Sequence, residues 1–310
     1  MPLDPIFTAL AGNGEGNSGG PYEVDSVRAG YDMANALAGT AELASVEDRT
    51  IPGPGGEIPV RVYRPQGTGP HPPVVFFHGG GWTIGSLTSH DGMCRQLAAL
   101  TPAVVVAVDY RLAPEHPFPA AVDDAWAATV WVADHPDEIG ARPGPVAVAG
   151  ESAGANLATV TAITARDRSG PSIAFQLLYV PTVDISLSHP SITENADGPF
   201  LTRSIMEWFF SQYAPAGVDH SDWRLSPLDH PDLSGLPPAL ILTAEFDPLR
   251  DEGEAYAARL AAAGVSARAS RYDGMAHTFA HFAGAVPQGR LALEEGAAAL
   301  REALGAPSTR

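Results

Sequence analysis

Short apolar runs, each bounded by proline or glycine, recur along most of the chain. Five of them are nearly continuous and rich in Val, Ile, Leu and Ala, at residues 74–77, 103–109, 146–150, 173–180 and 239–244. A continuous apolar run of this length indicates a strand that is buried on both faces, as in a parallel sheet, and not one with a face in water. The runs therefore predict the strands of a buried sheet.

Between several of these runs the apolar residues take the spacing of a helix. Such patterns cover residues 120–135, 152–167 and 250–264. Alternation of strands with helices predicts an α/β fold, in which a mostly parallel central sheet carries helices on both faces.

Two stretches interrupt the alternation. The first 45 residues are polar and partly Gly-rich, with one short amphipathic pattern at 25–39, and a bulky apolar helix is expected from Phe200 to Tyr213 with no strand beside it. An insertion that brings its own aromatic face predicts a cap over a site, with an ordinary packing helix as the alternative. We expect 1–45 to form the N-terminal part of the cap, 46–184 the first part of the core, 185–225 the cap insertion and 226–310 the second part of the core.

The chain is strongly acidic. It has 310 residues, of which 36 are Asp or Glu and 18 are cationic, for a net charge of −18. Nucleic acids and anionic membranes attract basic surfaces, so we expect neither as a partner. All 18 cationic residues are arginine, which excludes a Schiff-base lysine, a phosphate-binding lysine and a Ser-Lys dyad.

Cys94 is the only cysteine, which excludes an intramolecular disulfide and a zinc site built on several cysteines. The opening MPLDPIFTAL lacks the basic and long apolar regions of a signal peptide. No window approaches the roughly 18 unbroken apolar residues of a membrane span. We therefore expect a soluble, cytoplasmic protein.

A serine lies between two glycines where a predicted strand meets a predicted helix. Gly150-Glu151-Ser152-Ala153-Gly154 fits the pattern G-x-S-x-G in its proper strand–turn–helix context. Glycines two residues before and after the serine relieve the clashes that a Cβ would create in such a sharp turn. The motif predicts Ser152 as an exposed nucleophile above the sheet.

A Gly-rich turn follows the first predicted strand, at His78-Gly79-Gly80-Gly81. Consecutive glycines let backbone N–H groups turn toward one point, as the HGGG-type motif of lipases and esterases does. We expect the N–H groups of Gly80 and Gly81, with that of Ala153, to form an oxyanion hole, and His78 to hold the loop by hydrogen bonding.

A nucleophilic serine needs a base and an acid that orients the base, in the chain order Ser, Asp or Glu, His for this fold. Asp247 follows a predicted strand and precedes a helix, with Glu245 and Asp251 as weaker competitors. A last strand is expected in SARASRYDGMAHTFAHF, residues 266–282, and His277 lies on the loop after it. We expect Ser152, Asp247 and His277 to form the triad.

His281 is a rival base, and its spacing of four residues from His277 also fits a two-histidine metal site. The metalloprotease form of that site needs Glu directly after the first His, where this chain has Thr278. We expect no metal and no cofactor, with His281 packed or solvated. Residues 14–19, GEGNSG, fit G-x-G-x-x-G but follow no strand, which favours a loop over a dinucleotide site.

Aromatic residues are candidates for the substrate pocket. Trp82 follows the glycines of the turn and lines either the pocket or the core, and the cap insertion contributes Met206, Phe209 and Phe210. We expect side chains around Tyr22 and Tyr31 to join them from the N-terminal part of the cap.

Five motifs in order carry a family resemblance: HGGG at 78–81, DYRLAPEHPFPAAVDDA at 109–125, GESAGANLA at 150–158, DPLRDEG at 247–253 and DGMAHTF at 273–279. Over nearly the whole chain they resemble the bacterial hormone-sensitive-lipase-like esterases (family IV). The resemblance implies an α/β-hydrolase core with a helical cap, acting on short- to medium-chain carboxylic esters. Ala155 and Thr278 stand where relatives often have glycine.

The expected activity is hydrolysis of a small-molecule ester through an acyl-enzyme. An amide or activated-acyl hydrolase with the same triad is the alternative, and a ligand-binding receptor on this scaffold is disfavoured because all three triad residues are present. The sequence does not determine the oligomeric state, for which a homodimer is one alternative.

Overall fold

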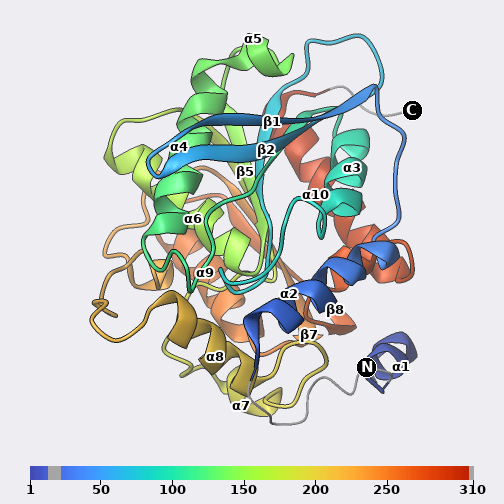
Figure 1. Ribbon diagram of the computed structural model, residues 1–310, viewed down its shortest axis with the longest axis vertical. Helices are drawn as coiled ribbons and strands as arrows, with labels where there is room; N and C mark the ends of the chain where they lie inside the picture. The colour runs from blue at the N-terminus through green and yellow to red at the C-terminus, as the bar shows by residue number, and fades with distance from the viewer. Residues whose placement is uncertain (13–21, 307–310) are drawn as a thin grey trace.

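An eight-stranded sheet runs through the centre of the molecule (Figure 1). The computed structural model describes residues 1–12 and 22–306, so the Gly-rich stretch 14–19 lies outside the described residues. The strand order is β1-β2-β4-β3-β5-β6-β7-β8. The strands are β1 (Ser45–Gly53), β2 (Gly56–Arg64), β3 (Pro73–Phe77), β4 (Val104–Val108), β5 (Val146–Glu151), β6 (Ile173–Tyr179), β7 (Ala239–Phe246) and β8 (Ala267–Ala276).

The strands from β3 to β8 pair in parallel, and each of the five predicted runs forms one of them. The antiparallel hairpin of β1 and β2 at the sheet edge was not predicted. Residues of β1 are mostly exposed or half-buried, so this strand has no continuous apolar run to mark it. The predicted mostly parallel sheet is confirmed.

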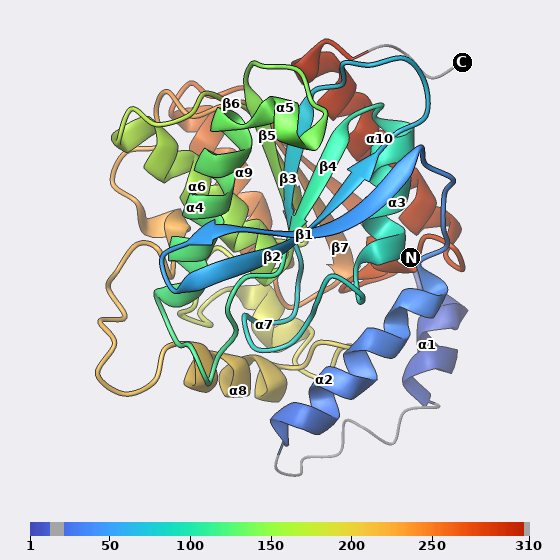
Figure 2. The same ribbon diagram turned by 45° about the horizontal axis from the view of Figure 1, so that its top comes forward.

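Helices cover both faces of the sheet (Figure 2). Helices α3 and α10 pack on one face and helices α4, α6 and α9 on the other, each group closing its own apolar core. Helix α6 is buried from Ala153 to Ala165, because its many small side chains let it lie close to the strands and to α4. The helices of the core are α3 (Asp91–Leu100), α4 (Ala120–Asp134), α5 (Pro136–Ile139), α6 (Ala153–Asp167), α9 (Arg250–Ala262) and α10 (Pro287–Leu304), with short η3 (Pro227–Asp229) and η4 (Phe279–Phe282).

A further group of helices lies beyond one end of the sheet (Figure 1). It comprises α1 (Pro5–Gly12), α2 (Val24–Asp32), η2 (Met33–Leu37), α7 (Pro190–Glu194) and α8 (Arg203–Tyr213). We call α2 and α8 the cap helices. They come from distant parts of the sequence but share one apolar cluster, in which Val27 and Tyr31 pack near Met206 and Phe209.

The helix expected from Phe200 begins instead at Arg203. Phe200 has φ +65°, outside the helical region, and its ring packs against Phe282 with centroids 5.2 Å apart. Thr202 caps the helix, because its Oγ1 accepts a hydrogen bond of 3.2 Å from the Ile205 N–H. The pattern of apolar residues runs across this boundary and does not reveal it.

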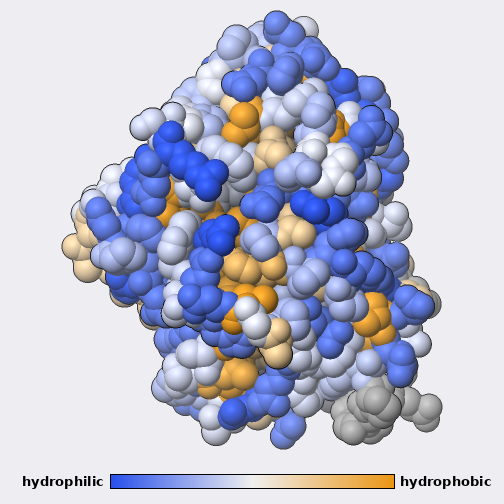
Figure 3. Space-filling model, turned by 60° about the vertical axis from the view of Figure 1, so that its left-hand side comes forward, coloured by the Kyte–Doolittle hydropathy of each residue, from blue (hydrophilic) through white to orange (hydrophobic). Residues whose placement is uncertain are grey.

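The surface is mostly hydrophilic on the face shown in Figure 3, where hydrophobic residues form only small separate patches. Among residues 1–12 and 22–306, no helix combines the length and the apolar character that a membrane crossing requires. The buried apolar side chains pack on the two faces of the sheet and under the cap helices.

Candidate active site

Ser152 occupies a strained turn between β5 and α6. Its backbone has φ +54° and ψ −118°, a region that residues with a Cβ rarely adopt. A Cβ on Gly154 would lie 2.0 Å from the Phe77 carbonyl oxygen, and one on Gly150 would lie 2.3 Å from the Gly154 carbonyl oxygen. The two glycines of the motif are therefore required by close packing of the turn against its own helix and the end of β3.

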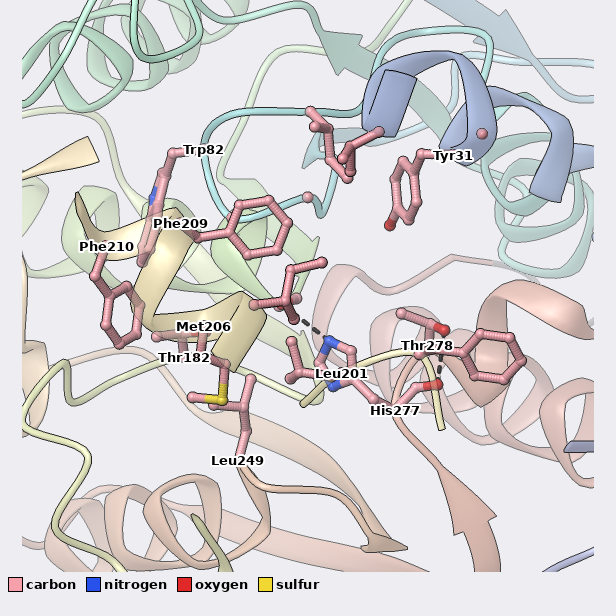
Figure 4. A pocket seen from close by; sticks show the side chains of 18 of the residues that line it. Tyr31, Trp82, Thr182, Leu201, Met206, Phe209, Phe210, Leu249, His277 and Thr278 are labelled. Atoms are coloured by element: carbon pink, nitrogen blue, oxygen red, sulfur yellow. Dashed lines mark hydrogen bonds between the residues drawn. The ribbon is translucent and has the colours of Figure 1, made fainter. Parts of the chain in front are cut away.

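The structure brings Ser152, His277 and Asp247 together at the carboxyl end of the sheet. His277 Nε2 lies 3.1 Å from Ser152 Oγ, and His277 Nδ1 lies 2.8 Å from Asp247 Oδ2. Asp247 follows β7 and His277 follows β8, which is the neighbouring strand. All three residues are buried, and the His277 ring reaches into a pocket (Figure 4). Ser152 is thus not exposed as the motif predicted, because residues of the cap helices line the pocket above it.

The competing carboxylates face other partners. Glu245 binds the N-terminal amine and accepts a hydrogen bond from the Gly274 N–H. Asp251 accepts a hydrogen bond from the Ser191 N–H and pairs with Arg250. Only Asp247 of these candidates contacts the His277 ring, and its other carboxylate oxygen accepts the Leu249 N–H at 2.9 Å.

The environment of His277 favours its protonated form. Burial of the ring by itself lowers its pKa, but the charge of Asp247 and the hydrogen bond to it act in the opposite direction, with a further contribution from Glu151. The net effect is a His277 pKa above the ordinary value for histidine. The ring is thereby a stronger base than free imidazole.

The glycine turn after β3 uses backbone conformations that favour glycine, as the sequence indicated. Gly80 and Gly81 have φ of +118° and +55°. A Cβ on Gly81 would lie 2.3 Å from the Phe209 ring, so glycine also lets the cap helix α8 approach this turn. Within the described part of the chain, the N–H groups of Gly80 and Gly81 donate to no protein acceptor.

The N–H groups of Gly80 and Gly81 are therefore available to a bound oxyanion. Both residues line the same pocket as Ser152 and His277. Ala153 is the first residue of α6, where backbone N–H groups have no partner within the helix. Two of the three predicted donors thus lie on the glycine turn after β3, and the third lies on the turn that carries Ser152.

His78 holds the turn and does not contact the serine. Its Nδ1 lies 2.8 Å from the Gly79 carbonyl oxygen, and its ring stacks on Tyr110 at a centroid distance of 4.2 Å. The Tyr110 hydroxyl donates to the His78 carbonyl oxygen at 2.8 Å. These contacts match the structural role expected for His78.

A largely apolar pocket of about 700 Å³ opens over the serine (Figure 4). The four residues expected from the sequence, Trp82, Met206, Phe209 and Phe210, all line it. The two alternatives for Trp82 both hold, since the side chain lines the pocket while being fully buried and stacked on Tyr213 at 4.3 Å. The lining also includes Thr182, Leu201, Ile205, Leu249 and Thr278.

The two tyrosines of the N-terminal segment differ in position. Tyr31 lines the pocket from α2, and its hydroxyl points inward (Figure 4). Tyr22 packs on Trp208, with ring centroids 5.4 Å apart, and its hydroxyl lies 3.0 Å from Ser204 Oγ. Tyr22 therefore joins the two cap segments and is not one of the pocket residues, contrary to the expectation.

His277 and His281 face different partners and do not form a common metal site. His277 contacts Ser152 and Asp247, whereas His281 Nδ1 lies 3.5 Å from Glu151 Oε2. Between them, Thr278 adopts a left-handed backbone conformation with φ +63°, which explains why glycine suits this position in relatives. Sequence reasoning did not single out Glu151 or His90, although an acidic residue directly before the nucleophile was a visible signal.

Comparison with known proteins identifies the family. A model of the alpha/beta hydrolase fold family matches residues 74–281. Carboxylesterase NlhH of Mycobacterium tuberculosis is 49% identical over 267 residues, which are 84% of this chain and 83% of NlhH. Ethyl acetate hydrolase of Pseudomonas putida is 38% identical over 266 residues, which are 83% of each protein.

A solved structure shows the same fold over almost the full length. The hyperthermophilic esterase from the archaeon Pyrobaculum calidifontis superimposes with a TM-score of 0.91 at 46% identity, covering 97% of this chain and 99% of that one. These matches confirm the resemblance that the motifs indicated. The chain belongs to the alpha/beta hydrolase fold family, within its hormone-sensitive-lipase-like branch (family IV).

Proposed function

We propose that this carboxylic ester hydrolase acts on short- to medium-chain esters through a Ser152–His277–Asp247 triad and an acyl-enzyme intermediate. The observation that carries the proposal is the hydrogen-bonded chain from Asp247 through His277 to Ser152 Oγ, with distances of 2.8 and 3.1 Å, at an apolar pocket. The names of two relatives, carboxylesterase and ethyl acetate hydrolase, support the bond type.

In the first half of the reaction Ser152 is acylated. His277 Nε2 takes the proton of Ser152 Oγ as the oxygen attacks the ester carbonyl carbon. The N–H groups of Gly80, Gly81 and Ala153 hold the negative oxygen of the tetrahedral intermediate, while Asp247 stabilises the imidazolium. His277 then gives its proton to the alkoxide oxygen as the C–O bond breaks, and the alcohol leaves.

In the second half water repeats these steps on the acyl-enzyme. His277 removes a proton from the water, whose oxygen attacks the acyl carbon. Collapse of the second intermediate breaks the bond to Ser152 Oγ, and His277 returns a proton to that oxygen. The products are the carboxylic acid and free enzyme.

The proposal is tested by covalent labelling together with turnover. We expect hydrolysis of p-nitrophenyl butyrate, insensitive to EDTA, and stoichiometric phosphorylation of Ser152 by a diethyl phosphate ester such as paraoxon, located by peptide mass spectrometry. Hydrolysis that persists while Ser152 stays unlabelled would sink the proposal. Parallel assay of the matching p-nitroanilide tests the amide alternative, which a faster anilide than ester would favour.

The pH profile should reflect the raised pKa of His277. The ring acts as a base only when neutral, and its raised pKa keeps it protonated to a higher pH than free histidine. We therefore expect kcat/KM to fall on acidification with a midpoint above the reference value of about 6.5. A rate profile between pH 5 and 9 in buffers of constant ionic strength measures it, and a midpoint below 6 would contradict the proposed environment of the base.

The limited volume of the pocket, about 700 Å³, should limit acyl length. Each added methylene that finds apolar space contributes about 0.8 kcal/mol, or about a fourfold gain in kcat/KM, until the pocket is filled. We expect kcat/KM to rise from acetyl to about butyryl or hexanoyl esters and then to fall, with no activation at an oil–water interface. A series of p-nitrophenyl esters measures this, and a preference for the longest chains would show that the cap helices open.

Phe209→Ala should move the optimum to longer acyl chains. The Phe209 ring lies against Gly81 beside the proposed oxyanion donors, so its removal enlarges the pocket next to the reacting carbon. Trp208→Ala is the matched control, because Trp208 is on the same helix and packs on Tyr22 and Phe209 but does not line the pocket. The same ester series measures both variants, and equal shifts in both would attribute the effect to loosening of the helix.

A further inference from the structure

A second cluster of titratable side chains lies behind the triad. Glu151, His90 and His281 have exposed fractions of 0, 1 and 1%. Glu151 Oε2 lies 3.0 Å from His90 Nε2 and 3.5 Å from His281 Nδ1. The proposed mechanism uses none of these groups, although Glu151 directly precedes Ser152.

The cluster connects three of the four chain segments that carry the proposed catalytic groups. Glu151 ends β5 beside the nucleophile, and His281 lies in η4, which follows the base His277. The Gly79 N–H donates to His90 Nε2 at 3.1 Å, which attaches the glycine turn to the same cluster. A movement of Glu151 would therefore shift the oxyanion donors relative to Ser152 Oγ.

The cap helix α2 closes the cluster from the pocket side. The Tyr31 ring lies over the rings of His90 and His281, with centroid distances of 5.9 and 6.0 Å. A Cβ on Gly79 would lie 3.2 Å from Glu151 Oε2 and 3.3 Å from the Tyr31 hydroxyl. The glycine turn is thus packed tightly between the carboxylate and the cap.

The charges of the cluster require a cation beside Glu151. Because Gly79 donates to His90 Nε2, that nitrogen carries a lone pair and the ring proton is on Nδ1, 2.9 Å from Ser89 Oγ. A lone pair 3.0 Å from a carboxylate oxygen is repulsive unless positive charge lies nearby. His281 is the side chain placed to supply that charge, because its Nδ1 lies 3.5 Å from the same carboxylate oxygen.

The protonation preferences agree with this arrangement. Burial lowers the pKa of His90 to about 4, so its ring is neutral. Burial raises the pKa of Glu151, but the hydrogen bond and the charge of His281 outweigh it and hold the pKa far below the usual range. The groups that face the carboxylate are His90, His281 and Tyr31, with His78 behind His90 at a ring distance of 5.7 Å.

We propose that Glu151, held by His90 and His281, is a positioning residue that fixes the glycine turn relative to Ser152. This inference rests on the proposed function. An oxyanion hole stabilises charge that exists only in the transition state, so a displaced turn lowers kcat and leaves substrate binding nearly unchanged. His281 acts through Glu151 and contacts neither the serine nor Asp247.

Glu151→Gln tests the proposal because it keeps the shape of the side chain and removes its charge. We expect kcat for p-nitrophenyl butyrate to fall about 10- to 100-fold, while KM stays within about twofold of the wild-type value. This fall in kcat is smaller than the one caused by removing an oxyanion donor outright. Because the charge of Glu151 raises the pKa of His277, the acid limb of kcat/KM should also move to lower pH. A packing defect would not produce that movement.

His281→Gln is the second variant, for use also if Glu151→Gln fails to fold. We expect a loss of kcat of about 5- to 10-fold, and the double variant should be no worse than Glu151→Gln alone, because both act through one contact. His230→Gln is the control for removal of a buried histidine, since His230 pairs with Asp167 outside this cluster. Thermal unfolding of every variant checks that the fold is intact.

Two results would overturn this proposal without contradicting the proposed serine esterase function. One is wild-type kcat and an unmoved acid limb in folded Glu151→Gln. The other is one equivalent of zinc in the purified enzyme by elemental analysis, whose removal by 1,10-phenanthroline lowers the melting temperature, because a metal ion would then be the cation beside Glu151. Failure of paraoxon to label wild-type Ser152 is a different outcome, which overturns the proposed function itself.

Discussion

Ser152→Ala should reduce ester hydrolysis to background, a loss in kcat on the order of 10⁶-fold, as expected when a triad loses its nucleophile. The fold should survive, because Ser152 makes no side-chain hydrogen bond that caps α6, and alanine meets the same backbone strain at φ +54° as serine does. The rate of p-nitrophenyl butyrate hydrolysis and the melting temperature together measure the two expectations.

Ser226→Ala is the control for this variant. Ser226 is also buried, and its Oγ accepts a hydrogen bond from the Ile185 N–H at a distance from the triad. We expect this variant to lose stability and keep kcat, the reverse of Ser152→Ala. Turnover above about 1% of wild type in Ser152→Ala would point to another nucleophile.

His277→Ala should lower kcat by about 10³-fold or more. Without the ring, nothing removes the proton from Ser152 Oγ or returns it to the leaving alcohol. Ser152→Ala combined with His277→Ala should be no slower than Ser152→Ala alone, because members of a triad act as a unit. Steady-state kinetics of the three variants measure this.

His281→Gln is the comparison that separates the two histidines. His281 lies four residues after His277 and is equally buried, but it faces Glu151. We expect its loss to cost about 5- to 10-fold in kcat, far less than the loss of the base. If the two variants exchanged these effects, the assignment of His277 as the base would be wrong.

The local pattern of apolar residues was sufficient to predict five strands of the parallel sheet, β3 to β7. A strand covered by helices on both faces is apolar at nearly every position. Such a strand is visible in the sequence as consecutive apolar residues, as in the run 146–150. The turn at Ser152 was visible for a similar reason, since its sharp backbone needs small residues at fixed offsets that a short motif preserves. The β1–β2 hairpin was missed because an edge hairpin with exposed residues has no such run.

The choice of the triad residues among several candidates depended on contacts between residues that are far apart in the sequence. Asp247 meets His277 across 30 residues, and Ser152 meets His277 across 125. Glu245, Asp247 and Asp251 look alike as carboxylates near one strand end, and only the register of β7 against β8 decides which one reaches the ring.

The sequence by itself determined the buried strands of the parallel sheet, the class of fold and the identity of a strained serine turn, because each depends on residues close together in the chain. The tertiary structure alone decided that Tyr31 and not Tyr22 lines the pocket, that α8 begins at Arg203, and that His90 meets Glu151 across 61 residues. These contacts arise where separate elements converge. Their geometry depends on how the helices pack on the sheet, which no local pattern encodes.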